Sequence, residues 1–170
     1  MKKLVIAALL VTPAFSWANP APFGLEIGKA TIKDVEAKYG AERTGINKYS
    51  NGEMYDLDVS GINFDGLQKA TVIFSKDGKL LAVLTTLPKN KFDYLLSSLS
   101  GKYKVVSKKL PYVGNKSAKF IDGNTEITLD APHLSFDMEM NYIDKDLWGS
   151  YKSQSSSEQK KKQQSEASQL

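Results

Sequence analysis

Cysteine is absent from this 170-residue sequence, and histidine occurs once, as His133. Without cysteine the chain has neither disulfides nor thiol chemistry, so its stability must come from an apolar core. Zinc sites need several histidine or cysteine ligands, and we expect no metal and no cofactor. A Ser-His-Asp hydrolase would have to use His133 with Asp130, and no nucleophile-elbow motif accompanies this pair. We therefore predict no catalytic residues and rank a hydrolase last among the alternatives.

Long apolar runs are scarce as well. The N-terminus contains one run, from Leu4 to Val11, which is eight residues long, whereas a membrane-spanning helix needs about 20. Two lysines precede the run, and small residues at positions 16 and 18 follow it. This order predicts a secretory signal peptide over residues 1–18, cleaved after Ala18. We expect an exported protein without a transmembrane segment, located in a bacterial periplasm or outside the cell.

The excess of positive charge lies outside the central part of the chain. The formal net charge is +4, but residues 19–151 contain 16 lysines and one arginine against 17 acidic residues. Nucleic-acid binding requires a basic face that neutralises phosphates, so we expect no nucleic-acid partner. Residues 152–170 are rich in Ser, Gln and Lys and nearly free of apolar residues. Such a segment cannot bury enough surface to offset its ordering entropy, and we expect a disordered basic tail with transient helix around residues 158–168.

Two short helices are expected within residues 19–151, a length that suits a single domain. Thr31 is a suitable N-cap with Asp34 three positions later, and Gly40 follows as a left-handed C-terminal residue. The second helix has an apolar face at helical spacing, is closed by Gly101, and contains Phe92, Leu95, Leu96 and Leu99.

Strand patterns follow each helix. Three dipeptides, Asn51-Gly52, Asp77-Gly78 and Asp122-Gly123, have the composition of hairpin turns. The segment 102–110 has the composition of a further strand. In the segment 133–142 apolar and polar residues alternate strictly, which predicts a strand whose core face consists of Leu134, Phe136, Met138, Met140 and Tyr142.

The order helix, strands, helix, strands divides the domain into two halves, residues 24–87 and 88–151. One helix on three or four strands buries little apolar surface, whereas two halves can join their sheets around one core. We therefore predict an α+β fold in which both helices lie on one antiparallel sheet of six to eight strands.

The segment 24–40, GLEIGKATIKDVEAKYG, resembles the opening of small exported bacterial domains. These domains form the β-lactamase-inhibitor-protein-like fold group, which includes outer-membrane-assembly lipoproteins. The resemblance implies a helical opening that leads into an antiparallel sheet and, in doubled versions, a concave binding face. Gly24 and Gly28 precede the helix, where glycine permits tight turns with positive φ. The chain departs from the group at Ala41, where proline is common, and it has no cysteine for lipidation.

Acidic and aromatic residues are the candidates for a recognition surface. An acidic sheet face with aromatic side chains suits a basic protein partner, because Tyr and Trp are enriched in interface hot spots. The predicted interface residues are Tyr49, Asp56, Asp58, Tyr112, Asp137, Glu139, Tyr142, Trp148 and Tyr151. Asp56 and Asp58 also begin a run like a calcium loop, but Leu67 stands where the bidentate glutamate belongs, so we expect no calcium.

Two binding functions agree with these patterns. The first is a periplasmic module without enzymatic activity that binds a protein in the cell envelope, as an inhibitor, an immunity-type protein or an envelope-assembly accessory. The second is a structural or adhesion-related envelope protein whose basic tail contacts peptidoglycan or anionic lipid, using Lys160, Lys161 and Lys162. The hydrolase that uses His133 is the third alternative.

Overall fold

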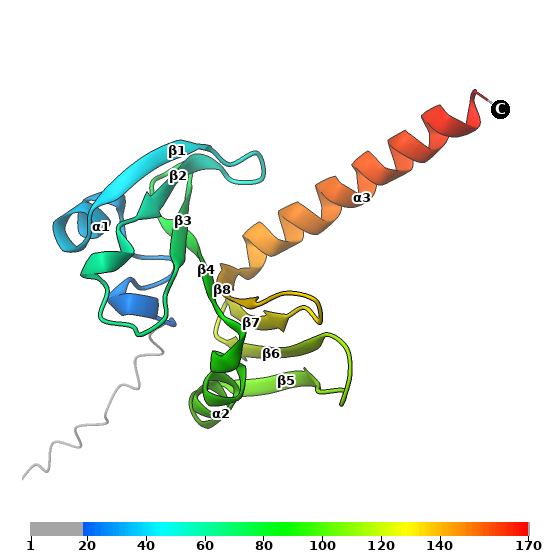
Figure 1. Cartoon of the computed structure of the whole chain (residues 1–170). Helices are drawn as coiled ribbons and strands as arrows, with labels where there is room; N and C mark the ends of the chain where they lie inside the picture. Colours follow the sequence, from blue (N-terminus) through cyan, green and yellow to red (C-terminus); the bar gives the residue numbers. More distant parts are fainter. Residues whose placement is uncertain (1–18, 170) are drawn as a thin grey trace, which may run out of the picture.

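The structure, a computed structural model, describes residues 19–169 (Figure 1). Its helical elements are the 3-10 turns η1 (Pro22–Gly24), η2 (Val59–Gly61) and η3 (Lys89–Lys91) and the α-helices α1 (Ile32–Lys38), α2 (Phe92–Lys102) and α3 (Lys145–Ala167). Its strands are β1 (Ala41–Ile46), β2 (Asn51–Leu57), β3 (Lys69–Ser75), β4 (Leu80–Pro88), β5 (Lys104–Lys109), β6 (Lys116–Asp122), β7 (Thr125–Ala131) and β8 (Asp137–Asp144). The predicted signal peptide, residues 1–18, lies outside the described residues.

The strands of residues 19–169 form one eight-stranded antiparallel sheet in the order β1-β2-β3-β4-β8-β7-β6-β5. Each half of the chain is a helix followed by a meander of four strands. The last strands of the halves, β4 and β8, pair at the centre, from Ala82 opposite Ile143 to Pro88 opposite Asp137. The predicted α+β fold with one antiparallel sheet is confirmed.

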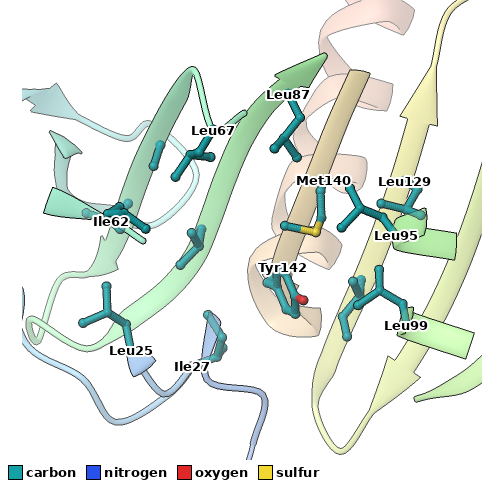
Figure 2. Close-up of a cluster of buried hydrophobic side chains, with 14 of the residues drawn as sticks. Leu25, Ile27, Ile62, Leu67, Leu87, Leu95, Leu99, Leu129, Met140 and Tyr142 are labelled. Atoms are coloured by element: carbon teal, nitrogen blue, oxygen red, sulfur yellow. The ribbon is translucent and has the colours of Figure 1, made fainter. Parts of the chain in front are cut away.

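One face of the sheet carries the main core. The inward strand residues include Val72, Val83, Phe120, Ile127 and Leu129, all of them fully buried. The segment before α1, α1 itself and α2 cover this face and contribute the buried side chains of Leu25, Ile27, Val35, Phe92, Leu95 and Leu99. Figure 2 shows Leu25 and Ile27 toward the first half of the sheet, and Leu95 and Leu99 toward the second half. The helices therefore share one core that spans both halves.

The segment before α1 is part of this framework. Gly24 and Gly28 have φ angles of +75° and +83°, as expected for glycines that form tight turns. The backbone N–H of Gly28 donates to the carbonyl of Leu80 (2.7 Å), and the N–H of Leu80 donates to the carbonyl of Ala30 (2.8 Å). These bonds attach the glycine-rich opening to the first residue of β4, so its role is structural.

The start of α1 agrees with the prediction. The carboxylate of Asp34 accepts hydrogen bonds from the backbone N–H and the hydroxyl of Thr31, each 2.8 Å long. These bonds hold the pKa of Asp34 below its ordinary value. The predicted N-terminal cap is confirmed.

The predicted roles of Gly40 and Gly101 as left-handed helix ends are wrong. Helix α1 ends at Lys38, and the next residue, Tyr39, already has an extended backbone. Gly40 does not have a positive φ angle. A Cβ at Gly40 would lie 3.2 Å from the Cβ of Asp58, so a close approach explains this glycine. Gly101 lies inside α2, which ends one residue later at Lys102. The backbone is extended at Tyr103, whose ring is buried.

Two of the three predicted hairpin turns are confirmed. Gly78 has φ of 73° between β3 and β4, and Gly123 has φ of 52° between β6 and β7. The β1–β2 hairpin instead turns over residues 47–50. There the side-chain oxygen of Asn47 accepts hydrogen bonds from the backbone N–H groups of Tyr49 (2.9 Å) and Ser50 (3.1 Å), which is the turn chemistry of asparagine.

Asn51-Gly52 therefore begins β2 and is not the turn itself. A Cβ at Gly52 would lie 2.0 Å from the carbonyl oxygen of Phe74 and 2.5 Å from the carbonyl carbon of Ser75 in β3. Glycine is needed here because two strands approach closely.

Leu134 and Phe136 do not face the core, in contrast to the prediction. Strand β8 begins only at Asp137, and both side chains are exposed in the loop before it. The N–H of Lys89 donates to the carbonyl of Phe136 (2.8 Å), and that of Ser135 donates to the carbonyl of Pro132 (3.3 Å). These bonds hold residues 132–136 in a loop conformation, so the alternation of buried and exposed side chains begins only at Asp137.

The expected disorder of residues 152–170 is contradicted as far as Ala167, because α3 continues to that residue (Figure 1). Asp144 caps the helix by accepting a hydrogen bond from the N–H of Asp146 (2.9 Å). Lys48 forms an ion pair with Glu158 (3.1 Å). Most of the following residues, Lys, Gln, Glu and Ala, have high intrinsic helix propensity. Intrinsic propensity and these contacts stabilise a helix whose buried contact, Leu147, lies in its first turn.

The outer strands of the sheet are irregular. In β1 the register with β2 shifts between Arg43 and Gly45. In β5 the register with β6 shifts between Val105 and Ser107, and every residue of this strand is exposed. A separate observation concerns the helices. Between residues 19 and 169, no helix is both long and apolar enough to cross a bilayer.

Gly52→Ala should lower the free energy of unfolding by more than about 2 kcal/mol, because the backbone of β3 would have to move away. Gly101→Ala is the matched control. Nothing lies within 4 Å of its added Cβ, and alanine favours a helix over glycine by about 0.5–1 kcal/mol. Urea unfolding followed by circular dichroism measures both variants. A Gly52→Ala protein as stable as the wild type would contradict the close approach of β2 and β3.

Candidate functional site

The candidate site lies on the sheet face opposite α1 and α2, which we call the open face. Strand alternation places Glu126, Thr128 and Asp130 of β7 on it, because their neighbours Ile127 and Leu129 are buried in the core. Glu139 and Asn141 of β8 lie directly opposite Asp130 and Thr128, respectively. Polar side chains from two central strands are therefore adjacent on the open face.

A groove of about 540 Å³ runs over the open face, a volume within the range of small binding sites. Its apolar lining consists of Ile73, Ala82, Leu84, Ile143 and Leu147. Its polar lining consists of Lys119, Glu126, Thr128, Asp130, Glu139 and Asn141. One end is formed by the β1–β2 turn and the first turns of α3, through Asn47, Tyr49, Trp148 and Tyr151.

Aromatic rings pack closely at that end of the groove. The ring of Tyr151 stacks on Trp148 with centroids 5.1 Å apart and meets the ring of Tyr49 edge-on, also at 5.1 Å. The ammonium groups of Lys48 and Lys152 lie 4.8 Å and 5.0 Å from the centroids of Tyr49 and Trp148. These contacts indicate that the ring faces attract cations.

The indole nitrogen of Trp148 is buried and has no hydrogen-bond acceptor among residues 19–169. A buried donor without an acceptor is unusual in folded proteins.

Two carboxylates of the groove, Asp130 and Glu139, form no ion pair within the described range. Burial raises the pKa of Asp130 above its ordinary value, and the charge of nearby Glu139 acts in the same direction. Glu126 differs, because its carboxylate pairs with Lys119 at 2.8 Å. The groove therefore has local negative charge that an incoming cation could neutralise.

A smaller hollow of about 190 Å³ continues the open face toward β3 and shares Glu139 and Asn141 with the groove. Asp56 lies beside it, where it pairs with Lys69 (3.1 Å) and accepts a hydrogen bond from the hydroxyl of Thr71. The acidic character of the open face thus extends to β2, but there it is balanced by lysine.

The structure brings together four of the predicted interface residues, Tyr49, Glu139, Trp148 and Tyr151, all of which line the groove. The others do not join them. Asp58 caps η2 by accepting a hydrogen bond from the N–H of Ser60, Asp137 lies at the start of β8, and Tyr112 lies exposed in the β5–β6 loop.

Tyr142 is a correction, because it lies in the core and not on an exposed surface. Its ring meets that of Tyr103 at 6.3 Å, and burial raises its pKa well above the ordinary value. Met138 and Met140 already indicate that even-numbered residues of β8 face the core, so the alternation itself assigns Tyr142 to that side.

Sequence reasoning missed the contribution of β7 to the site. Glu126, Thr128 and Asp130 alternate with apolar residues, and this pattern could have identified their shared face. Their position opposite Glu139 and Asn141 could not be derived, because it depends on how β7 and β8 pair. His133 lies exposed in the β7–β8 loop, and residues 19–169 contain no cluster of three or more metal-ligating side chains.

Comparison of the chain with protein-family models, with curated proteins and with solved structures gives no match. The chemistry of the groove therefore has to be judged from its own geometry.

Asp130→Asn should stabilise the protein at pH 7 more than at pH 3. A carboxyl whose pKa is raised by folding favours the protonated form in the native state, so its destabilising effect develops as pH rises through about 4 and above. Asp34→Asn is a control of opposite sign, because the pKa of Asp34 is lowered and its stabilising effect disappears at low pH. Urea unfolding at both pH values tests this. An equal effect of Asp130→Asn at pH 3 and pH 7 would contradict it.

Proposed function

We propose that the chain is a periplasmic protein-binding module without enzymatic activity, and that the groove binds a basic segment of a protein in the cell envelope. The observation that carries the proposal is the adjacent pair Asp130 and Glu139. These carboxylates face each other across β7 and β8 beside an apolar floor, and neither forms an ion pair in the described part of the chain. The nearby Lys119 acts on Asp130 through its charge but pairs with Glu126.

The lining of the groove fits a lysine or arginine side chain. The aliphatic stem of such a residue can pack on Leu84 and Ile143 while its charged group reaches the two carboxylates. The rings of Tyr49 and Trp148 already attract Lys48 and Lys152 of this chain, so the aromatic end of the groove suits an apolar side chain of the bound segment. A segment with basic residues and at least one apolar residue therefore satisfies both parts of the groove.

Two further observations support the proposal. The N-terminal pattern of lysines, apolar block and small residues favours export to the periplasm. The resemblance to the β-lactamase-inhibitor-protein-like group implies a helical opening that leads into an antiparallel sheet, and the two halves of this chain agree with that arrangement. His133 does not line the groove, which favours recognition over acid–base chemistry there.

The test is affinity capture from periplasmic extract with the chain from Asn19 to Leu170. The double variant Asp130→Asn/Glu139→Gln should reduce the amount of captured protein at least about tenfold. The lysine or arginine of the bound protein would then have lost both carboxylates that it contacts. The matched control is Glu36→Gln/Asp77→Asn, which removes the same charge from exposed positions outside the groove. Mass spectrometry with labelled reference peptides quantifies the partner.

Equal capture by the groove variant and the wild type would contradict the proposal. Deletion of residues 153–170 separates it from a tail-mediated function, because that deletion should leave partner capture intact. Substrate turnover that disappears in His133→Ala would instead support the hydrolase alternative.

A further inference from the structure

Two loops at one end of the sheet expose large apolar side chains. The register places residue 116, which follows the β5–β6 loop, opposite residue 131, which precedes the β7–β8 loop. Loops 110–115 and 132–136 are therefore neighbours, and we call them the loop pair. Its exposed side chains, with their exposed fractions, are Tyr112 (104%), Leu134 (93%), Phe136 (93%), Val113 (67%) and Leu110 (49%). Several large apolar side chains exposed on neighbouring loops indicate a surface for a protein or a membrane.

The loop pair is held in place by hydrogen bonds. The side-chain oxygen of Asn115 accepts a hydrogen bond from the backbone N–H of His133 (2.8 Å), which joins the two loops. The side chain of Lys89 donates to the carbonyl groups of Pro132 and His133, and its backbone N–H donates to the carbonyl of Phe136. The exposed side chains therefore stand on a fixed framework, so little ordering entropy is lost when they bind a surface.

Positive charge accompanies the exposed apolar side chains. Residues 102–121 contain six lysines and no acidic residue. Three of them, Lys108, Lys109 and Lys116, lie at the loop-pair end of β5 and β6, whereas Lys104 lies at the other end. Lys108 and Lys109 end β5 next to the loop pair and form no ion pair among residues 19–169. Lys116 pairs loosely with Asp93 (3.6 Å), and Asp130 and Asp137 are the other acidic residues nearby. Around the loop pair, four lysines (Lys89, Lys108, Lys109 and Lys116) lie near three acidic residues (Asp93, Asp130 and Asp137), which leaves a local net charge of +1.

We propose that the loop pair inserts into the interface of an anionic phospholipid bilayer and attaches the folded domain to it. Phe136, Leu134 and Tyr112 would enter the headgroup and upper acyl region, while Lys108 and Lys109 contact lipid phosphates. An exposed tyrosine suits this interface because its ring is amphipathic. Apolar insertion and charge supply the two contributions that stable peripheral binding requires.

Lipid fits this surface better than a protein. The core of a protein interface is depleted in lysine, whereas lysines flank the loop pair. A protein partner also requires a broad complementary patch of about 800 Å² on each side. Here the apolar side chains project singly from two loop tips, with exposed fractions of 93% or more for three of them. The loop pair does not line the groove, so this inference stands independently of the proposed function.

Vesicle co-sedimentation of residues 19–170 tests the inference. The protein should bind vesicles of phosphatidylethanolamine and phosphatidylglycerol (3:1) and should not bind pure phosphatidylcholine. Phe136→Ser and Leu134→Ser should each weaken binding at least about fivefold, because each removes an apolar side chain that would be buried in the bilayer. Ile46→Ser is the matched control, because Ile46 is similarly apolar, 62% exposed and at the opposite end of the sheet. Urea unfolding confirms that each variant is folded.

Charge removal distinguishes the loop pair from the tail. Lys108→Gln/Lys109→Gln should weaken binding at least about tenfold, since each lysine near an anionic surface contributes several-fold. Lys160→Gln/Lys161→Gln removes the same charge from α3 and should change binding little. Raising the salt concentration from 0.1 M to 0.5 M should weaken binding further.

Insertion depth provides an independent readout. Within residues 19–170 the wild type contains one tryptophan, Trp148, which lies at the groove. Brominated lipids should quench the fluorescence of a Phe136→Trp variant and leave that of the wild type unchanged. Absence of vesicle binding, equal binding by Phe136→Ser, or loss of binding in the α3 variant would overturn the inference. So would a change from dimer to monomer in Phe136→Ser, because the loop pair would then be a protein interface.

Discussion

The antiparallel pairing of β4 with β8 is the constraint on which the fold depends. Its inward positions include Val83 opposite Tyr142 and Leu87 opposite Met138, so each pair contributes core residues from both halves. The hydroxyl of Thr85 donates to the carbonyl of Met140, which satisfies both groups in a buried position. Because the two meanders pair through β4 and β8, the sheet is continuous, and the helices of both halves cover one face of it.

The open face and its groove follow from that arrangement. With α1 and α2 on the core face, the other face is covered at one end by the β1–β2 turn and the start of α3, which lies there because it begins directly after β8. Asp144 ends β8 beside α3, and Asp137 begins β8 beside the loop pair. At about 3.3 Å per residue, the aromatic end of the groove and the loop pair are separated by roughly 23 Å. A domain attached to lipid by the loop pair would keep the aromatic end of the groove directed away from the bilayer.

Much of the fold could be predicted from local patterns, because turns and amphipathic faces depend on nearby residues. Gly78 and Gly123 occupy their expected turns, and Phe92, Leu95 and Leu99 form the expected buried face of α2. The predictions were wrong where contacts between segments distant in sequence determine the local conformation. Gly40 and Gly52 are glycines because other segments approach them, and Leu134 and Phe136 leave the strand pattern because Lys89 holds their loop. The same limit applies to the site. Its aromatic residues and Glu139 could be identified from the sequence, but the position of Asp130 opposite Glu139 depends on how β7 and β8 pair.

The irregular register of β1 and β5 has a consequence for copies of this chain that meet one another. An outer strand with a regular hydrogen-bonding edge can extend its sheet with a strand from another molecule, which leads to aggregation. A bulge interrupts that edge and twists it away from a flat template, and the lysines of β5 repel a second β5. The sheet is thereby protected against edge-to-edge self-association, which matters for a chain that has no disulfide to limit its unfolding.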